Sequence, residues 1–344
     1  MSKKPRKPWP CSPSWKRPAD EYRDPVAARR LIAKITARAT RSIHIMEFCG
    51  GHTHAIMRYG IRQALAPHVR MLSGPGCPVC VTADMDIDHA IALARLPGVT
   101  VATFGDMMRV PGTKASLQQA RAEGADVRMV YSALDALELA RQNPARSVVM
   151  LGIGFETTAP TIAASLVQAR ETGVKNYYTY SMQAIVDAGE VREDAVLGPG
   201  HVTAITGWRA WEFLPRDYRV ACAVSGFEPL DILQAVYLLT DAVETGHPYV
   251  ANPYARGVEA EGNRVAQQLM DQVFEVTDAA WRGIGEIPAS GLGLRAAYAA
   301  PDARLACIRQ GLHTRPARRP LHGFQRGVLR GPLPLWGDAR WMSE

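Results

Sequence analysis

The sequence predicts an α/β protein with two lobes whose parallel sheets face a cleft. A third, mostly helical or irregular C-terminal domain follows, which we expect to be incomplete. Three observations support this fold class. Short apolar or β-branched runs alternate with amphipathic stretches from Ile43 onward, a pattern typical of parallel sheets with right-handed crossovers. The connections between them are short, and 47% apolar residues in a chain of 344 suffice for two or three cores.

Each expected strand is a short apolar run bounded by turn residues, and these runs lie at 43–48, 69–73, 99–104, 127–131, 147–153, 174–180 and 219–225. Between them, apolar residues recur at helical spacing, which predicts helices at 54–65, 84–96, 114–123, 133–142, 158–172, 230–245 and 259–276. An earlier helix is expected after Asp24-Pro25, a typical N-cap and first helical residue. The segment 281–292 is rich in glycine and shows no strand period.

This pattern divides the chain into five segments. Residues 1–23 are basic and rich in proline, which predicts a disordered arm. The first α/β lobe is expected over 24–112 and the second over 113–225, because the segment around Arg109 to Gly112 interrupts the alternation. A third domain is expected over 226–303. Residues 304–344 lack a pattern that would bury one face and are expected to be a disordered tail.

Charge and composition exclude several classes of function. The net charge of +7 comes from the two ends, since residues 1–17 hold six basic residues and no acidic one. No nucleic-acid-binding face is therefore predicted. The sequence has no run of about 18 uncharged apolar residues and no signal-peptide pattern, so we expect a cytoplasmic protein that does not enter a membrane. Catalytic Ser-His-Asp, His-Glu-x-x-His and phosphate-loop patterns are absent as well.

The segment 47–54 (Glu-Phe-Cys-Gly-Gly-His-Thr-His) lies where a strand ends and a helix begins. Gly50 and Gly51 allow a tight turn, and amides at a helix start favour a thiolate at Cys49. One cysteine and two histidines, His52 and His54, fall within six residues. The pattern predicts a functional loop.

A second loop, 74–80 (Gly-Pro-Gly-Cys-Pro-Val-Cys), follows the next strand. The thiols of Cys77 and Cys80 can cycle through a disulfide, or they can hold one soft metal ion. Because the carboxyl ends of parallel strands share one sheet edge, we expect Cys49 to lie with Cys77 and Cys80 across a crevice, with sulfur atoms within about 10 Å of one another.

Other polar residues also follow expected strands. They are Asp106 and Arg109 after the third strand, Glu156 in the segment 152–158 (Gly-Ile-Gly-Phe-Glu-Thr-Thr), and His201 after Pro199-Gly200. Glu156 is a candidate site carboxylate, and in the alternative interpretation Thr157 or Thr158 simply caps the next helix. The segment 227–231 is expected to begin a helix.

Seven motifs in one order resemble the HypD family of [NiFe]-hydrogenase maturation proteins. They occupy 47–54, 74–80, 104–112, 154–160, 199–202, 226–231 and 281–285. The resemblance implies a scaffold, rather than a turnover enzyme, on which an Fe(CN)2(CO) unit is assembled with a HypC-like chaperone and a cyanide donor like HypE. It places the cleft cysteines of the family on Cys49, Cys77 and Cys80, and the histidine of its motif on His52. It also implies a [4Fe-4S] cluster.

Two departures from the family pattern stand out. The segment 181–187 lacks the histidine and proline pair that the family carries before Pro199. The family also has four cluster cysteines near its C-terminus, whereas this chain has only Cys307 after Trp281. The remaining cysteines outside the two loops, Cys11 and Cys222, are poorly placed to converge with it, so we expect no cluster.

Three alternatives to an assembly scaffold remain open on these residues. A thiol-disulfide oxidoreductase would use Cys77 and Cys80 and would be indifferent to Cys49. A structural zinc site would combine Cys49, Cys77 and Cys80 with one histidine. The chain can also be a degenerate family member that folds without maturing a hydrogenase.

Overall fold

The structure, a computed structural model, describes residues 20–74, 76–184 and 193–304. Its strands are β1 (Ile43–Glu47), β2 (Val69–Ser73), β3 (Val99–Thr103), β4 (Val127–Met129), β5 (Ser147–Gly154), β6 (Tyr177–Ala184), β7 (Ala195–Pro199), β8 (Ala221–Ser225), β9 (Val250–Ala251), β10 (Phe274–Trp281) and β11 (Gly285–Leu294). The α-helices are α1 (Pro25–Arg38), α2 (Gly50–Arg58), α3 (Ile61–Leu65), α4 (Pro78–Val81), α5 (Asp84–Ala94), α6 (Leu117–Ala122), α7 (Ala133–Gln142), α8 (Ala159–Glu171), α9 (Gly200–Thr206), α10 (Pro229–Thr245) and α11 (Arg264–Val273). Short 3-10 or π turns are η1 (Asp20–Arg23), η2 (Gly105–Arg109), η3 (Trp208–Trp211), η4 (Leu214–Tyr218) and η5 (Ala296–Tyr298).

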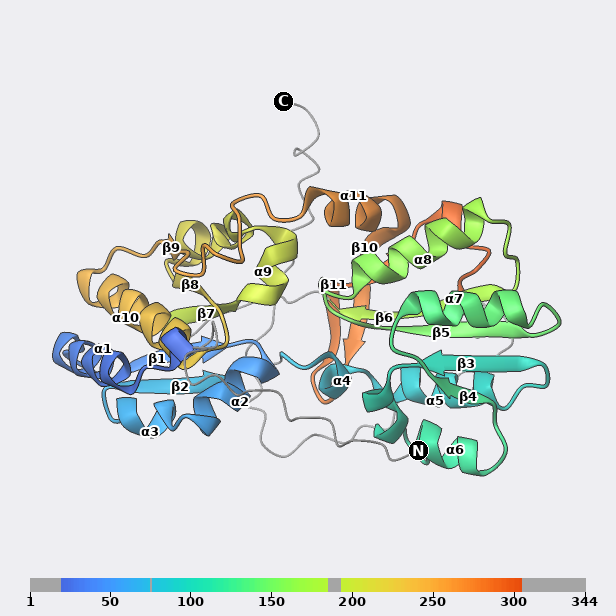
Figure 1. Ribbon diagram of the computed structural model, residues 1–344, viewed down its shortest axis with the longest axis horizontal. Helices are drawn as coiled ribbons and strands as arrows, with labels where there is room; N and C mark the ends of the chain where they lie inside the picture. The colour runs from blue at the N-terminus through green and yellow to red at the C-terminus, as the bar shows by residue number, and fades with distance from the viewer. Residues whose placement is uncertain (1–19, 75, 185–192, 305–344) are drawn as a thin grey trace, which may run out of the picture.

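Two sheets lie side by side and form two lobes (Figure 1). The first has the order β2-β1-β7-β8-β9 and is parallel throughout. The second has the order β10-β11-β6-β5-β3-β4, in which β3 to β6 are parallel and the last hairpin is antiparallel. The prediction of an α/β fold with parallel sheets is therefore confirmed.

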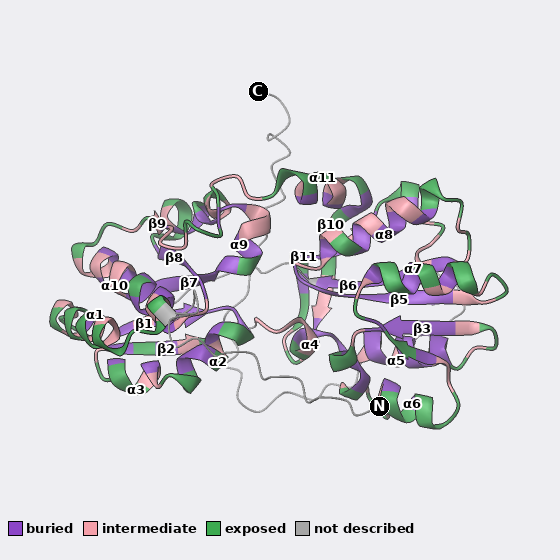
Figure 2. Cartoon of the chain, viewed as in Figure 1, coloured by how far each residue is buried: buried purple, intermediate pink, exposed green. Residues whose placement is uncertain are grey.

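Residues alternate between two cores along the first sheet, as the period of a strand requires. Ile43 and Ile45 of β1 pack with the helices α1, α2, α3 and α10 on one face. Met46 of the same strand joins a second core on the other face. This second core is continuous between the lobes, because it also contains Phe155 and Trp281. The central strands β5, β7 and β8 are buried along almost their whole length, as their purple colour in Figure 2 shows.

Helix ends follow local chemistry that the sequence displays. The carboxylate of Asp24 accepts a hydrogen bond from the amide of Val26 at 2.7 Å, and Pro25 opens α1, as predicted. Likewise α10 begins after Glu228, whose amide donates to Asp231 at 3.3 Å. It ends at Gly246, which adopts a left-handed backbone conformation.

The C-terminal hairpin corrects one prediction. The segment 281–292, expected to lack strands, contributes to β10 and β11, and the expected helix 259–276 ends at Val273. The hairpin joins the second sheet because β11 pairs with β6 in antiparallel register, Leu292 opposite Gln183. The glycines and Pro288 within β11 interrupt the alternation of apolar and polar residues by which a strand is predicted.

Strand pairing also differs from the contiguous lobes expected over 24–112 and 113–225. β3 lies before residue 112 but pairs with β4 and β5 in the second sheet. β7 and β8 lie before residue 225 but pair with β1 in the first. The chain passes between the sheets after β2, after β6 and after β9, so each sheet is built from separate parts of the sequence.

The N-terminal segment expected to be disordered ends in a short ordered turn. Residues 20–23 form η1, in which Arg23 binds Glu228 and the Tyr22 ring lies 3.9 Å from the guanidinium carbon of Arg256. The rest of that segment, with Cys11, lies outside the described residues, as do Cys307 and the tail after Arg304. Within the part of the chain that the structure describes, no helix has the length and apolar character needed to cross a membrane.

Candidate functional site

Four loops meet at the carboxyl edge of the first sheet. Cys49 follows β1, Cys77 follows β2, His201 follows β7 and Phe227 follows β8, and these four strands are neighbours in one parallel sheet. Such an edge is where ligands bind in open α/β folds. The structure therefore brings the two cysteine loops to one sheet edge.

The two cysteine loops are in direct contact at Gly76. A β-carbon at Gly76 would lie 1.9 Å from the carbonyl oxygen of Phe48 and 2.4 Å from the amide nitrogen of Cys49. Only glycine permits two backbone segments to approach so closely. In addition, the amide of Gly74 donates to the carbonyl of Glu47 at 2.7 Å. These contacts hold the segment leading to Cys77 against the segment that carries Cys49.

Cys49 is the N-cap residue of α2, and its backbone and side chain contact Gly51, Glu47 and His201. Its sulfur accepts a hydrogen bond from the amide of Gly51 at 3.3 Å, and its own amide donates to the carboxylate of Glu47 at 2.8 Å. The hydroxyl of Thr53 donates to the second oxygen of that carboxylate. The Nε2 atom of His201 lies 3.8 Å from the sulfur. A thiol, a histidine and a helix start thus meet at one point.

The predicted preference for a thiolate at Cys49 is wrong in direction. Burial raises the pKa of this thiol, and the nearby negative charge of Glu47 raises it further. Hydrogen bonds from the amides of His52 and Gly51 lower it, as a helix start should, but do not outweigh the loss of water. Cys49 is therefore protonated at neutral pH until something replaces its proton.

His52 is buried and joins two loops. Its Nε2 donates to the carbonyl of Gly226 at 2.9 Å, and its ring centroid lies 4.8 Å from that of Phe227. Burial lowers its pKa to about 4, so the ring is neutral at physiological pH. The same Phe227 ring lies 3.1 Å from the position of a β-carbon at Gly51. His52 thus connects the Cys49 helix to the loop after β8.

The Cys77 and Cys80 sulfurs lie 2.7 Å apart at the start of helix α4, and both residues are free cysteines. Cys77 is the N-cap residue, and its sulfur accepts from the amide of Cys80 at 3.3 Å. Burial, followed by the hydrogen bond to Cys77, raises the pKa of Cys80 to about 11. The positive charge of Arg282 acts in the opposite direction. This geometry suits a reversible dithiol.

Sequence analysis gave no role to Arg282, although the structure sets it against the dithiol helix. It belongs to the turn between β10 and β11, and its guanidinium contacts the carbonyl of Thr82 and the carboxylate of Asp84. The preceding residue, Trp281, forms an isolated bridge with Thr82. Arg282 and the segment after the cysteine pair are about 200 residues apart in the sequence, so their proximity could not be predicted from a local sequence pattern.

The remaining predicted residues lie elsewhere. His54 is exposed on α2, Gly50 is exposed at its start, and Asp106 and Arg109 are exposed on η2 after β3. Glu156 is buried after β5 in the second sheet. Thr158 occupies the N-cap position of α8, as the alternative interpretation has it, but its hydroxyl donates to the carbonyls of Ile153 and Phe155 and makes no capping hydrogen bond.

Among the described residues, no three His, Cys, Asp or Glu side chains are grouped as metal ligands. Cys49 and the dithiol share an edge, but their sulfurs are not arranged as a closed tetrahedral site would require.

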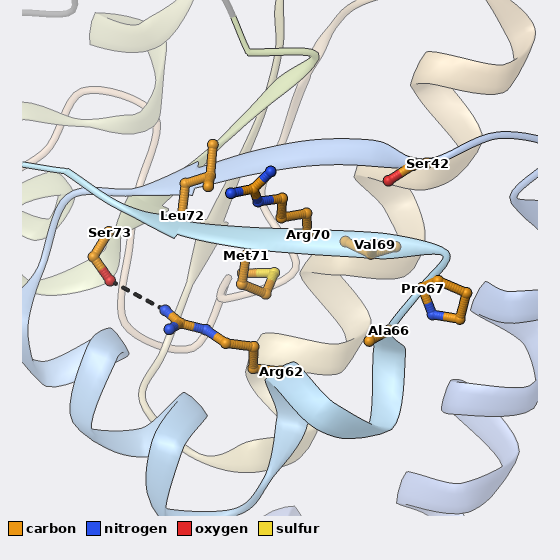
Figure 3. Close-up of a pocket in the computed structure, with 9 residues that line it drawn as sticks. All are labelled: Ser42, Arg62, Ala66, Pro67, Val69, Arg70, Met71, Leu72 and Ser73. Carbon is orange, nitrogen blue, oxygen red and sulfur yellow. Dashed lines mark hydrogen bonds between the residues drawn. The ribbon is translucent and has the colours of Figure 1, made fainter. Parts of the chain in front are cut away.

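A separate open depression of about 480 Å³ runs along β2, the edge strand of the first sheet (Figure 3). Arg62 reaches across it to the Ser73 hydroxyl at 3.5 Å, and Arg70 lies on its other side. None of the predicted site residues lines it. A second depression, of about 450 Å³, includes Arg109 and Gln119. Neither contains a cysteine.

Comparisons with known proteins converge on one family. The family model described as "HypD: Hydrogenase formation hypA family" matches residues 26–328. A hydrogenase maturation factor HypD of Rhodobacter capsulatus is 46% identical over 301 residues, which cover 83% of this chain and 80% of that protein. The protein of that name from Escherichia coli (strain K12) is 44% identical over 344 residues, 93% of this chain and 90% of that one. A third, from Azotobacter vinelandii, is 44% identical over 91% of this chain and 86% of its own length.

Proposed function

The chain belongs to the HypD family of hydrogenase maturation proteins, and from this premise we propose that it is a scaffold for assembling the Fe(CN)2(CO) unit of a [NiFe]-hydrogenase active site. A role in hydrogenase maturation follows from the family itself. The iron and its diatomic ligands are the cargo of this scaffold. Low-spin iron that carries cyanide and carbon monoxide is a soft centre, for which thiolates are suitable ligands.

Cys49, with Cys77 or Cys80, is the proposed ligand set. The observation that carries this proposal is the contact of the two cysteine loops at Gly76, where a β-carbon would lie 1.9 Å from the Phe48 carbonyl. Because burial raises the pKa of Cys49, iron binding must release its proton. The Nε2 atom of His201, 3.8 Å from that sulfur, lies at the side where a bound group would sit.

The dithiol is proposed to supply electrons during assembly. Two thiols give up two electrons and two protons when they form a disulfide, and the Cys77 and Cys80 sulfurs are 2.7 Å apart. A HypC-like chaperone and a HypE-like cyanide donor are the proposed partners. The exposed His54, Asp106 and Arg109 are proposed to contact partners or cargo. Glu156 is proposed to act as a buried carboxylate after β5. Free thiols in these roles suit the cytoplasm.

A [4Fe-4S] cluster, which the family implies, does not fit the residues that the structure describes. Such a cluster takes four thiolates. Outside the two loops, the described residues offer Cys222, which is fully buried in β8 and whose pKa burial raises. We therefore derive no step through a cluster.

Infrared spectroscopy of protein purified anaerobically with its chaperone partner tests the iron assignment. We expect Cys49→Ala to lose the cyanide and carbonyl bands completely, because the remaining thiols lie in a single loop. Cys222→Ala is the matched control, since that thiol is buried away from the edge, and it should retain the bands. Unchanged bands in Cys49→Ala would exclude this assignment.

The 2.7 Å approach of the two sulfurs favours a second candidate, a thiol-disulfide oxidoreductase. That function requires no iron and no Cys49. Reduction of a disulfide substrate by the iron-free protein, at equal rates in wild type and Cys49→Ala, would support it in place of the scaffold.

A further inference from the structure

Helix α4, which contains Cys80 and is preceded by Cys77 as its N-cap residue, is too short to be stable by itself. It consists of Pro78–Val81, and a single helical turn does not recover the cost of nucleation. Its N-terminal side is held by the amide of Cys80, which donates to the Cys77 sulfur. The carbonyls at its C-terminal end have no partners within the helix. Something outside the helix must hold them.

Arg282 supplies these partners from the hairpin. Its backbone amide donates to the carbonyl of Val81 at 2.8 Å, and its Nε donates to the carbonyl of Thr82 at 2.7 Å. Thr82 in turn donates from its hydroxyl to the carbonyl of Pro78 at 2.8 Å, closing the turn on itself. The carbonyls of Val81, the last residue of α4, and of Thr82, its C-cap residue, are thus both bound by one residue distant in sequence.

The Arg282 side chain is itself fixed. One terminal nitrogen lies 2.9 Å from the carboxylate of Asp84, and the other donates to the carbonyl of Pro111 at 2.8 Å. The side chain is only 15% exposed. The neighbouring residue, Trp281, is held in place as well, because its indole nitrogen donates to the Ser290 hydroxyl at 2.9 Å. The planar fork of an arginine can make these bonds at once, which a lysine cannot.

We propose that Arg282 is a positioning residue for the dithiol: by capping α4 from the β10–β11 turn, it holds the Cys77 and Cys80 sulfurs at the separation from which a disulfide forms. This inference rests on the redox role proposed above for the two thiols. It goes beyond that role because it states that the C-terminal hairpin sets the distance between the two sulfurs. The hairpin then contributes a positioning residue to the site.

The relevant reaction is exchange with glutathione disulfide, which serves as the oxidant. The thiols of Cys77 and Cys80 are oxidised to one disulfide, while glutathione disulfide is reduced to two glutathione thiols that carry the two protons. The equilibrium constant for this exchange measures how well the two sulfurs are held together. It is measured on the whole chain without iron, so its outcome is separate from that of iron binding.

We expect Arg282→Ala to lower this equilibrium constant about tenfold, which corresponds to about 30 mV in reduction potential. Arg282→Lys should give an intermediate value, because it keeps the charge and loses the fork. The Cys77–Cys80 disulfide is quantified by mass spectrometry of the alkylated, digested protein. Thermal unfolding is recorded for each variant.

Arg295→Ala is the matched control. Arg295 also caps a carbonyl from the same hairpin, that of Asp271 at 2.6 Å, but lies at the other end of β11. This variant should keep the wild-type constant even where its unfolding temperature falls. A wild-type constant in Arg282→Ala and Arg282→Lys would overturn the proposal. If Arg282→Ala does not fold, Arg282→Lys decides, with a lowered constant in support and an unchanged one against.

Discussion

Burial and hydrogen bonding act in opposite directions at Cys49. Amides of α2 stabilise a thiolate there, whereas the removal of water and the charge of Glu47 oppose it. The outcome is a thiol whose pKa is raised and which stays protonated at neutral pH. In the proposed scaffold, this balance would protect Cys49 before iron binds, because an exposed thiolate is open to oxidation.

His52 should make the stability of the protein depend on pH. Its pKa is about 4 in the folded chain and 6.5 ordinarily, so between these values the unfolded chain binds the additional proton. Stability is then full above pH 6.5 and falls as the pH drops toward 4, by roughly 3 kcal/mol from this residue. Urea denaturation at a series of pH values measures this loss.

The matched pair for this measurement is His52→Gln and His247→Gln. Glutamine at residue 52 keeps a donor for the Gly226 carbonyl but does not titrate, so the slope between pH 4 and 6.5 should become shallower. His247 is exposed beyond α10, and its replacement should leave the slope as it was. Equal slopes in all three proteins would contradict the assignment.

Gly76→Ala should separate the two cysteine loops. The added methyl group would lie 1.9 Å from the Phe48 carbonyl, so the backbone must move, at a cost of about 1–3 kcal/mol. We expect a loss of that size in urea denaturation, together with loss of iron loading measured by elemental analysis. Gly50→Ala is the stability control, because nothing lies within 4 Å of its β-carbon position. Retained loading in a destabilised Gly76→Ala would argue against a shared site.

At the scale of elements, the β10–β11 hairpin packs against the segment that follows the cysteine loop 74–80, although the two are about 200 residues apart in the sequence. Trp281 is 4% exposed and packs with Phe155, ring centroids 6.2 Å apart, in the core that joins the lobes. Trp281→Ala should therefore cost about 3–5 kcal/mol in urea denaturation. Trp281→Phe keeps one aromatic ring but loses the bond to Ser290 and part of the indole packing, so it should cost less, about 1–3 kcal/mol. A cost under 1 kcal/mol for the alanine variant would show that the hairpin does not support the core.

Sequence patterns predicted the strands of strong apolar character and missed those with weak periods. β1, β2, β3 and β5 were predicted almost to the residue, because each is a run of apolar or β-branched side chains. β7 is short and ends in Gly198-Pro199, and β11 contains Pro288, so neither shows a strand period. The edge shared by the cysteine loops followed from parallel topology alone. Arg282 did not, since its partners are set by packing between distant segments.

At the scale of the whole molecule, the number of thiols limits which cofactors the chain can hold. After residue 225 it contains only Cys307, and Cys11 and Cys222 are the others outside the two loops. We predict that anaerobic reconstitution with iron and sulfide will not build a [4Fe-4S] cluster. Iron and acid-labile sulfide are counted per chain after desalting, with Cys307→Ser as the control. About four of each per wild-type chain would refute the prediction.

Three connections between the sheets, after β2, after β6 and after β9, restrict how the lobes move. A movement of one sheet against the other therefore acts on all three connections at once. The dithiol helix lies on the first of these connections and the turn that caps it follows the third. A rotation of one lobe against the other would therefore shift α4 relative to the turn that caps it, and we predict that the separation of the Cys77 and Cys80 sulfurs depends on the relative position of the two sheets.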